Sequence, residues 1–267
     1  MAQAQEFRRV SDIVQDALQP ASFFGNYSPA GRESDPPAWG TPYMRWRGRY
    51  TTVELRAGKS GPELVSDFTD MWEDGYRHAM SSKPTGFVGA VAGPDGIQGA
   101  KFSPASDWGE LLGMMTGFLT GLTAELTAFG MSLSLGIFGR FHTEDGRTDS
   151  PMMFDLRCSD RLHFGYLGPD AADPAGLGWS RTDPRELLDG TGLEHFEAPW
   201  HFDAGGLGAE KAAEAAELIV ETARAAGVRE AGDLMLGEEA EYYPVQSRAK
   251  FRGPYTFRYP GLGLRTA

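Results

Sequence analysis

The sequence is poor in cysteine, in positive charge and in long uncharged runs, and each shortage excludes a class of protein. Its single cysteine, Cys158, cannot form an intramolecular disulfide, which is compatible with a reducing compartment. Acidic residues outnumber basic residues by 37 to 25, and the net charge of −12 repels nucleic-acid backbones and anionic lipid headgroups. The segment from Met1 to Arg9 has no apolar signal-peptide region. We therefore expect a cytoplasmic protein with neither nucleic acid nor a membrane as its partner.

Catalytic signatures are also missing. The sequence has no GxSxG nucleophile elbow, and the glycines before Lys101 do not follow P-loop spacing. With 267 residues and 41% hydrophobic content, the chain can bury a core as one large domain or two small ones. The composition favours a binding protein over an enzyme, so no catalytic residue and no cofactor are expected.

The clearest predicted elements lie in the second half of the chain. Asp107 precedes apolar residues at helical spacing and Gly130 follows them, which predicts a capped helix over 107–129. An Ala- and Glu-rich segment that ends at Gly227 predicts a second long helix over 208–226. Strands are predicted between these helices at residues 132–141, 152–157 and 161–167.

The first hundred residues predict a short helix, two hairpins and a second helix. Phe7 to Leu18 places apolar residues on one helical face, and residues 43–56 alternate as a hairpin that turns near Gly48. Pro62 in a first-turn position predicts a helix from residue 60. The apolar face of that helix consists of Leu64, Val65, Phe68, Met71, Trp72 and Tyr76. Another hairpin is predicted over residues 87–102.

These elements divide the chain into a first αβ half over 1–104, a second over 105–242 and a tail over 243–267. The segments TPYMRWRGRYTTVELRAG and SPMMFDLRCSDRLHFGYLG both place Thr-Pro or Ser-Pro before a hairpin. The tail alternates aromatic residues with arginines and contains Pro254 and Pro260, which predicts an edge strand and a loose end. We expect an α+β fold of antiparallel sheets covered by helices, with two related halves as one arrangement of it.

The second half carries landmarks in a recognisable order. A helix opens with Asp107-Trp108-Gly109-Glu110-Leu111, and PMMFDLRCSDRLHFGYLG follows as a strand pair. Leu177-Gly178-Trp179, then HFEAPW and then ELIVETARAAGV come after it. In this order residues 107–236 resemble the actinobacterial family grouped with YbjN and the type III secretion chaperones. The resemblance implies a helix-flanked antiparallel sheet and chaperone-like peptide or protein binding, without catalytic residues.

Aromatic residues of this half are the predicted peptide-binding residues. Trp179 and Trp200 lie in Gly- and Pro-rich, loop-like sequence, so a core position is less expected for them than for the aromatic residues on the strands. Amphipathic rings in such places can line a groove for a peptide. The predicted groove consists of Phe154, Phe164, Tyr166, Trp179, Trp200 and Phe202. An acidic rim would favour basic or amphipathic clients.

Glycines recur every four residues along the helix predicted over 107–129. They are Gly109, Gly113, Gly117 and Gly121. Each costs about 0.5–1 kcal/mol of helix stability relative to alanine, so a close neighbour is expected on that face. The neighbour can be the protein's own sheet, the same helix of a second copy, or other helices in a membrane. Because the uncharged run before Glu125 is shorter than the ~20 residues that span a bilayer, packing within the protein is favoured.

The segment HFEAPWHFD predicts a strand with one ionisable and one aromatic face. The ionisable face carries His195, Glu197, His201 and Asp203, and the other carries Phe196, Trp200 and Phe202. Imidazoles and carboxylates can ligate zinc or a non-haem metal, so a metal-dependent enzyme using His195, Glu197 and His201 is an alternative. On a straight strand the two histidines lie roughly 20 Å apart, and only a bend at Pro199 would bring them together. A solvated face is the simpler interpretation, and no metal is expected.

The sequence therefore predicts a non-enzymatic protein that binds a polypeptide through an apolar groove or an exposed sheet edge, as a homodimer. Cys158 beside His163 is a weak nucleophile candidate, because no third group is identifiable. The alternatives from other classes are the metal-dependent enzyme and a membrane-active protein that uses the glycine-containing helix over 108–129.

Overall fold

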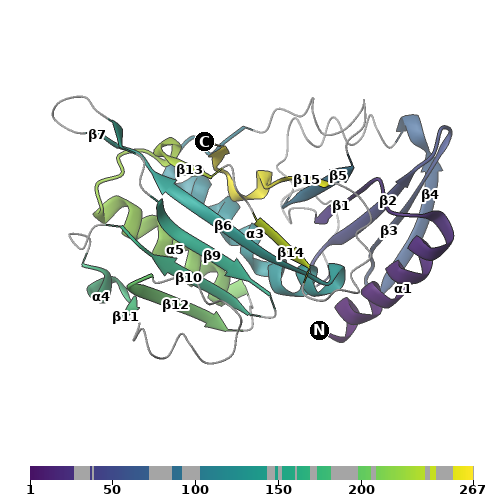
Figure 1. Ribbon diagram of the computed structural model, residues 1–267, viewed down its shortest axis with the longest axis horizontal. Coiled ribbons are helices and arrows are strands. Elements are labelled where there is room, and N and C mark those ends of the chain that lie inside the picture. The colour runs from purple at the N-terminus through teal and green to yellow at the C-terminus, as the bar shows by residue number, and fades with distance from the viewer. Residues whose placement is uncertain are drawn as a thin grey trace.

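The computed structural model shows two mainly antiparallel sheets with helix α3 (Trp108–Phe129) between them (Figure 1). The structure describes residues 1–26, 37, 39–71, 86–91, 103–142, 148–149, 152–159, 161–168, 173–181, 198–205, 209–237, 241–244 and 255–266. Helices and antiparallel sheets are both present, so the predicted α+β class is confirmed.

The first half consists of helix α1 (Ala2–Leu18) and a six-stranded sheet of order β15-β5-β1-β2-β3-β4. The helix buries Ala4, Phe7, Ser11 and Val14, whose spacing places them on one face. The strands are β1 (Phe23–Asn26), β2 (Pro42–Arg47), β3 (Thr51–Ala57), β4 (Pro62–Phe68), β5 (Val88–Val91) and β15 (Tyr255–Arg258).

The second half contains the eight-stranded sheet, of order β11-β12-β10-β9-β6-β13-β16, with β14 also paired to β6. Its strands are β6 (Met131–Gly139), β9 (Met152–Cys158), β10 (Leu162–Tyr166), β11 (Ser180–Arg181), β12 (Trp200–Gly205), β13 (Leu234–Leu236), β14 (Glu241–Pro244) and β16 (Arg265–Thr266). The remaining elements are the pair β7 (Phe141–His142) and β8 (Thr148–Asp149), the helices α4 (Pro174–Leu177) and α5 (Ala209–Ala225), and the 3₁₀ helices η5 (Ala231–Asp233) and η6 (Pro260–Leu262).

Helices α3 and α5 pack on each other and cover the inner face of this sheet, as predicted. The strict alternation of buried and half-buried residues along β6 fits a sheet with one covered face. The predicted caps of α3 are also present. The Asp107 side chain accepts a hydrogen bond from the Glu110 N–H at 2.9 Å, and Gly130 adopts the left-handed conformation with φ 65°.

The two halves follow the same chain path. Each begins with a helix, continues through four successive antiparallel strands, enters another helix and ends in a strand that returns beside the first. The strand orders are β5-β1-β2-β3-β4 and β13-β6-β9-β10-β12. The helix after β4 is described only at residues 69–71, and the second half adds β7, β8, α4 and β11 to the pattern.

The two similar sequence segments occupy equivalent places in this repeat. One forms the hairpin β2–β3 and the other the hairpin β9–β10, which are the second and third strands of their halves. The shared Thr-Pro or Ser-Pro thus precedes the same strand in each half. The sequence similarity and the shared topology therefore support each other as signs of an internal repeat.

The tail contributes a strand to both sheets. Strand β15 pairs with β5, and the Phe24 ring contacts Tyr255 and Phe257 at centroid distances of 4.8 and 5.6 Å. Farther on, Leu262 is fully buried and β16 pairs in parallel with β13. The predicted edge strand is present, but the predicted loose end is wrong for residues 255–266, because their apolar side chains complete the core between the sheets.

The helix predicted from residue 60 is also wrong over its first turns. Residues 62–68 form strand β4, which pairs with β3 along its whole length. The spacing of Leu64, Phe68 and Met71 suits a helix, but the tight turn from Gly58 to Gly61 folds the chain back onto β3 first. Helix begins only at Thr69. Of the hairpin predicted over 87–102, the structure describes the first strand, β5, which pairs with β1 and β15.

Candidate functional site

Large apolar side chains are exposed in one part of the molecule. Those with exposed fractions of 46% to 69% among the described residues are Met1, Ile13, Leu18, Tyr50, Leu64, Phe68 and Met71. All lie in α1 or at its N-cap, in the β2–β3 turn, or in β4 and the residues after it. Clustered exposed apolar residues mark interaction surfaces on many soluble proteins, which directs attention to this corner of the first sheet.

Strand β4 is the longest sheet edge in the described structure. It has seven residues, pairs with β3 on one side, and no described strand pairs with its other side. The other outermost strands, β15, β14, β11 and β16, have four, four, two and two residues. Natural proteins keep open edges short or covered, because an open edge can pair with another chain. Of these edges, β4 is the one best suited to accept an added strand.

The hydrogen-bond pattern shows which residues of β4 face outward. The Gly58 N–H donates to the Gly61 carbonyl at 2.9 Å, and the Thr69 N–H donates to the Tyr50 carbonyl at 3.0 Å. Bonded and non-bonded pairs alternate in an antiparallel ladder, so the residues between these two pairs alternate too. The residues whose backbone groups point away from β3 are therefore Pro62, Leu64, Ser66 and Phe68. The two large apolar side chains of β4 belong to this outward set.

Two features limit this edge without closing it. Pro62 has no N–H to offer. The Phe68 N–H donates to the Asp67 side chain at 2.7 Å, which occupies one outward donor. The backbone groups of Leu64 and Ser66 remain directed toward the open side. We call the outward backbone and the side chains of Leu64, Ser66 and Phe68 the β4 edge.

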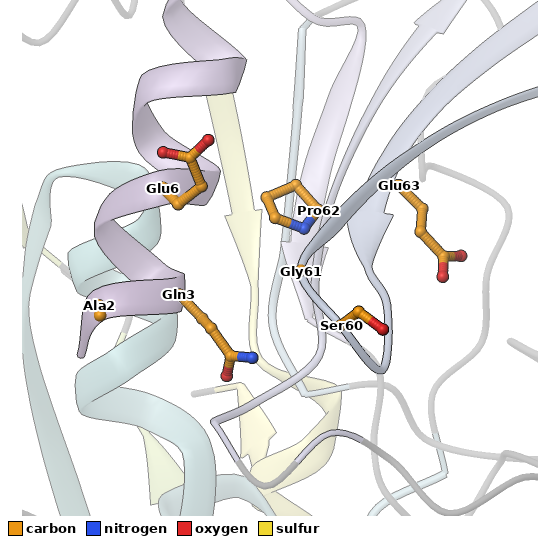
Figure 2. Close-up of a pocket in the computed structure, with 7 residues that line it drawn as sticks. All are labelled: Ala2, Gln3, Glu6, Ser60, Gly61, Pro62 and Glu63. Carbon is orange, nitrogen blue, oxygen red and sulfur yellow. The ribbon is translucent and has the colours of Figure 1, made fainter.

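An open pocket of about 510 Å³ lies between α1 and the start of β4 (Figure 2). Its lining residues are Ala2, Gln3, Glu6, Ser60, Gly61, Pro62 and Glu63. Pro62 points toward α1, whereas the Glu63 carboxylate extends away from it. Side chains alternate between the two sides of a strand. Leu64, Ser66 and Phe68 therefore lie on the same side of β4 as Pro62, which is the α1 side, and Glu63 lies on the other side. Pocket and β4 edge therefore open on the same side of the sheet.

The charged groups around the pocket are paired. Arg9 donates to Glu6 at 2.6 Å, and Arg56 lies 3.5 Å from Glu63. The Arg9 hydrogen bond lowers the pKa of Glu6, so this carboxylate keeps its charge. The two carboxylates at the pocket are thus balanced by arginines, although the chain as a whole is acidic. A molecule bound in this corner would contact mainly apolar surface and backbone groups.

Four of the six residues predicted to line an aromatic groove are buried. Phe154, Phe164, Tyr166 and Trp179 have exposed fractions of 3% or less. Trp179 stacks on Phe154 with ring centroids 6.1 Å apart, and its Nε1 donates to Thr222 Oγ1 at 2.8 Å. The indole N–H thus has its partner inside the protein. The prediction that these four residues form an open groove is wrong, because α5 covers the face on which they lie.

Trp200 and Phe202 are half-buried at the rim of the same core. They pair across the strands with Tyr166 and Phe164, which places them on the inner face of the sheet. The Arg181 guanidinium lies 6.0 Å from the Trp200 ring centroid. Part of each ring can reach solvent, but the two rings do not form a groove with the other four predicted residues.

The ionisable face predicted for HFEAPWHFD is present in its described part. His201 and Asp203 lie on the outer face of the sheet, beside His163. The Arg161 guanidinium binds the Asp203 carboxylate at 2.6 Å, and His163 Nδ1 lies 3.9 Å from the same carboxylate. His195 and Glu197 lie outside the described residues. Among the residues that are described, no group of three or more His, Cys, Asp or Glu is placed to hold a metal ion.

Cys158 and His163 do not form a nucleophile and base. Cys158 is buried and pairs with Leu162, whereas His163 pairs with Arg157. Successive residues of a strand point to opposite faces, so the thiol lies on the inner face and the imidazole on the outer one. The sheet separates the two groups, and this weak catalytic candidate is wrong.

The glycines of α3 have two different environments. Gly109 and Gly113 are exposed, and a Cβ built on Gly113 meets no atom within 4 Å. A Cβ on Gly121 would lie 3.1 Å from the Gly40 Cα and 2.8 Å from Glu125 Oε1. Gly117 is half-buried. Close packing within the protein therefore accounts for Gly121. A Cβ on Gly109 would lie 3.3 Å from Asp107 Oδ1, and Gly113 has open space in the described structure.

Glu125 links the two halves, which the sequence did not predict. Its side chain is 2% exposed, accepts a hydrogen bond from the Thr41 N–H at 2.8 Å, and also accepts from the Asn26 side-chain amide. The side-chain oxygen of Asn26, Oδ1, in turn accepts a hydrogen bond from the Phe87 N–H. A buried carboxylate needs such donors to offset its lost hydration. Glu125 thus attaches α3 to two segments of the first half directly and to a third, at Phe87, through Asn26.

Asp155 is a second buried carboxylate, on the outer face of the second sheet. It pairs with Gly136 on β6 and Gly165 on β10, and Arg157 contacts it at 2.6 Å. Burial raises the pKa of Asp155, and the charge of Arg157 opposes that rise.

Comparison with known proteins gives no relative. No family model, no curated protein and no solved structure matches the chain. The resemblance to the YbjN and secretion-chaperone family therefore stays a prediction. In the described residues, α3 is long and apolar enough to cross a membrane, and half of its apolar window is buried inside the fold, as in the core helix of a globular protein.

A sequence signal for the β4 edge does exist. Gly58-Lys59-Ser60-Gly61 directly follows the predicted strand 51–57 and is typical of a hairpin turn. Leu64, Ser66 and Phe68 then alternate with Glu63, Val65 and Asp67. The helical spacing of the same apolar residues competes with this signal, so only the pairing with β3 decides between the two.

Proposed function

We propose that the protein binds an extended polypeptide segment, which adds as a strand to the β4 edge. The observation that carries the proposal is the coincidence of two features on the same residues. Leu64 and Phe68 have outward-facing backbone groups and also exposed side chains, 56% and 68% respectively. An added strand can therefore pair with the backbone and contact the apolar side chains at once.

The geometry defines the chemistry of the ligand. Residues directly opposite each other in an antiparallel pair lie on the same face, so two ligand residues four positions apart would contact Leu64 and Phe68, and the residue midway between them would face Ser66. Each apolar cross-strand pair contributes about 0.2–1 kcal/mol, and main-chain hydrogen bonds add affinity that does not depend on sequence. The expected ligand is an extended segment with two apolar residues four positions apart on one face.

The test begins with selection of peptides from a random library on the purified protein. A double variant, Leu64→Ser with Phe68→Ser, serves for counter-selection, because exposed substitutions of this kind leave the fold nearly unchanged. We expect selected peptides with apolar residues four positions apart and, because two apolar pairs are lost, about 2- to 30-fold weaker binding to the double variant. Equal binding to both proteins would contradict the proposal.

N-methylation of the selected peptide provides a matched control. A methyl group on an amide that faces β4 removes a hydrogen bond, whereas one on the next amide points away from β4. We expect binding to fall at every second position only. Loss without this alternation would exclude strand addition even if the peptide binds nearby.

A further inference from the structure

We infer that the β4 edge also pairs with β4 of a second copy, which makes the protein a symmetric homodimer when no client occupies the edge. The inference rests on the same surface as the proposed function, but its test is separate. In an antiparallel pair of identical strands, one residue lies on the two-fold axis and faces its own copy. The sequence of β4 decides which residue that is.

An axis at Ser66 makes the strand self-complementary. Leu64 then faces Phe68 of the second copy, and Phe68 faces its Leu64, so both exposed apolar side chains find an apolar partner. These pairs and the Ser66 pair all have outward-facing backbone groups, and each can exchange two hydrogen bonds. Asp67 faces Val65, and Glu63 lies opposite the end of the partner strand, so no two like charges face each other within the paired strands.

The neighbouring registers are worse. An axis at Val65 sets Glu63 against Asp67 of the second copy and Phe68 against Pro62, which has no N–H. An axis at Asp67 sets the two copies of this carboxylate against each other. Like charges directly opposite each other destabilise a strand pair. Among these registers only the Ser66 axis joins the apolar residues and separates the acidic ones.

Asp67 opposes this association. Its side chain occupies the Phe68 N–H at 2.7 Å, and that N–H is needed for the bond to Leu64 of the second copy. Dimerisation has to break this local bond, which lowers the affinity. We therefore expect a dimer that dissociates on dilution and that a polypeptide client displaces.

The test is a charge exchange at the two-fold axis. Ser66→Lys and Ser66→Asp each place like charges face to face, and sedimentation velocity should show at least about tenfold weaker self-association for each. An equimolar mixture of the two variants should regain a dimer, because Lys then faces Asp. Ser180→Lys on the exposed edge strand β11 is the matched control and should dimerise like the wild type.

The outcomes separate this inference from the proposed function. A wild type that stays monomeric at every concentration, or a dimer that both Ser66 variants leave unchanged, overturns the inference. Failure of the mixture to regain a dimer overturns the Ser66 axis and with it the inference. Peptides that still bind the monomeric Ser66 variants would leave the proposed function standing. Asp67→Ala should strengthen the wild-type dimer severalfold, and weakening would contradict the role assigned to Asp67.

Discussion

Replacing Glu125 with alanine is expected to lower the free energy of unfolding by about 2–5 kcal/mol. The carboxylate accepts hydrogen bonds from the Thr41 N–H and from the Asn26 amide, and all three groups are buried. Alanine leaves both donors without this acceptor, and a buried unpaired donor costs about 1–3 kcal/mol. The alanine variant no longer has to bury a charge, and this gain offsets part of the combined cost of the two unpaired donors. The expected loss therefore stays below that combined cost.

Urea unfolding followed by circular dichroism measures this loss. Glu125→Gln keeps the volume and one acceptor oxygen, so its cost should lie between those of the wild type and the alanine variant. Glu217→Gln, at an exposed position of helix α5, is the matched control and should leave the unfolding midpoint near that of the wild type. An alanine variant within about 0.5 kcal/mol of the wild type would refute the reasoning, because Glu125 would then not hold the halves together.

Three further predictions concern glycine packing, the tail and alkaline stability. Gly113→Ala should stabilise the protein by up to about 1 kcal/mol and Gly121→Ala should destabilise it in thermal unfolding, because only the second Cβ meets close neighbours; equal midpoints would contradict this. Leu262→Ala should cost about 2–5 kcal/mol in urea unfolding because the side chain is fully buried, and a negligible cost would mean that the tail is loose after all. Burial raises the pKa of Tyr255 to about 12, so the unfolded chain loses this proton first and stability falls as pH rises above about 10. In urea unfolding at a series of pH values, Tyr255→Phe should lose less stability above pH about 10 than the wild type does. A pH dependence identical to that of the wild type would contradict this prediction.

Elements with strong local signals could be predicted from the sequence. Helix α3 has a capping aspartate, sustained apolar spacing and a terminal glycine, and all three features agree on the same element. The faces of β12 followed from simple alternation, with Trp200 and Phe202 inward and His201 outward. Where local signals agree with each other, tertiary packing did not overrule them.

Strand β4 could not be predicted because its local signals conflict. Leu64, Phe68 and Met71 fit a helical face, and Pro62 fits a first turn, but pairing with β3 determines the structure. The buried aromatic residues were misjudged for a related reason. Glycine and proline around Trp179 indicate a loop, and the short helix α4 within that loop carries the ring into the core, where Thr222 accepts its N–H. Such long-range contacts leave no trace in local spacing.

Glu125 shows the same limit for polar residues. In the sequence it is the only charge between Leu111 and Gly139, with nothing nearby to mark a partner. Its donors come from Asn26 and Thr41, 99 and 84 residues away. Only the association of the two halves brings them together, so the site at their junction follows from the fold.

The most direct test of strand addition at β4 is amide hydrogen exchange in dilute protein, with and without a selected peptide. The outward amides of Leu64 and Ser66 should exchange fast in the free protein and become protected when the peptide binds. The inward amides of Val65 and Asp67 should be protected in both states, because they belong to the ladder with β3. Tight peptide binding that leaves Leu64 and Ser66 exchanging as fast as before would contradict the account.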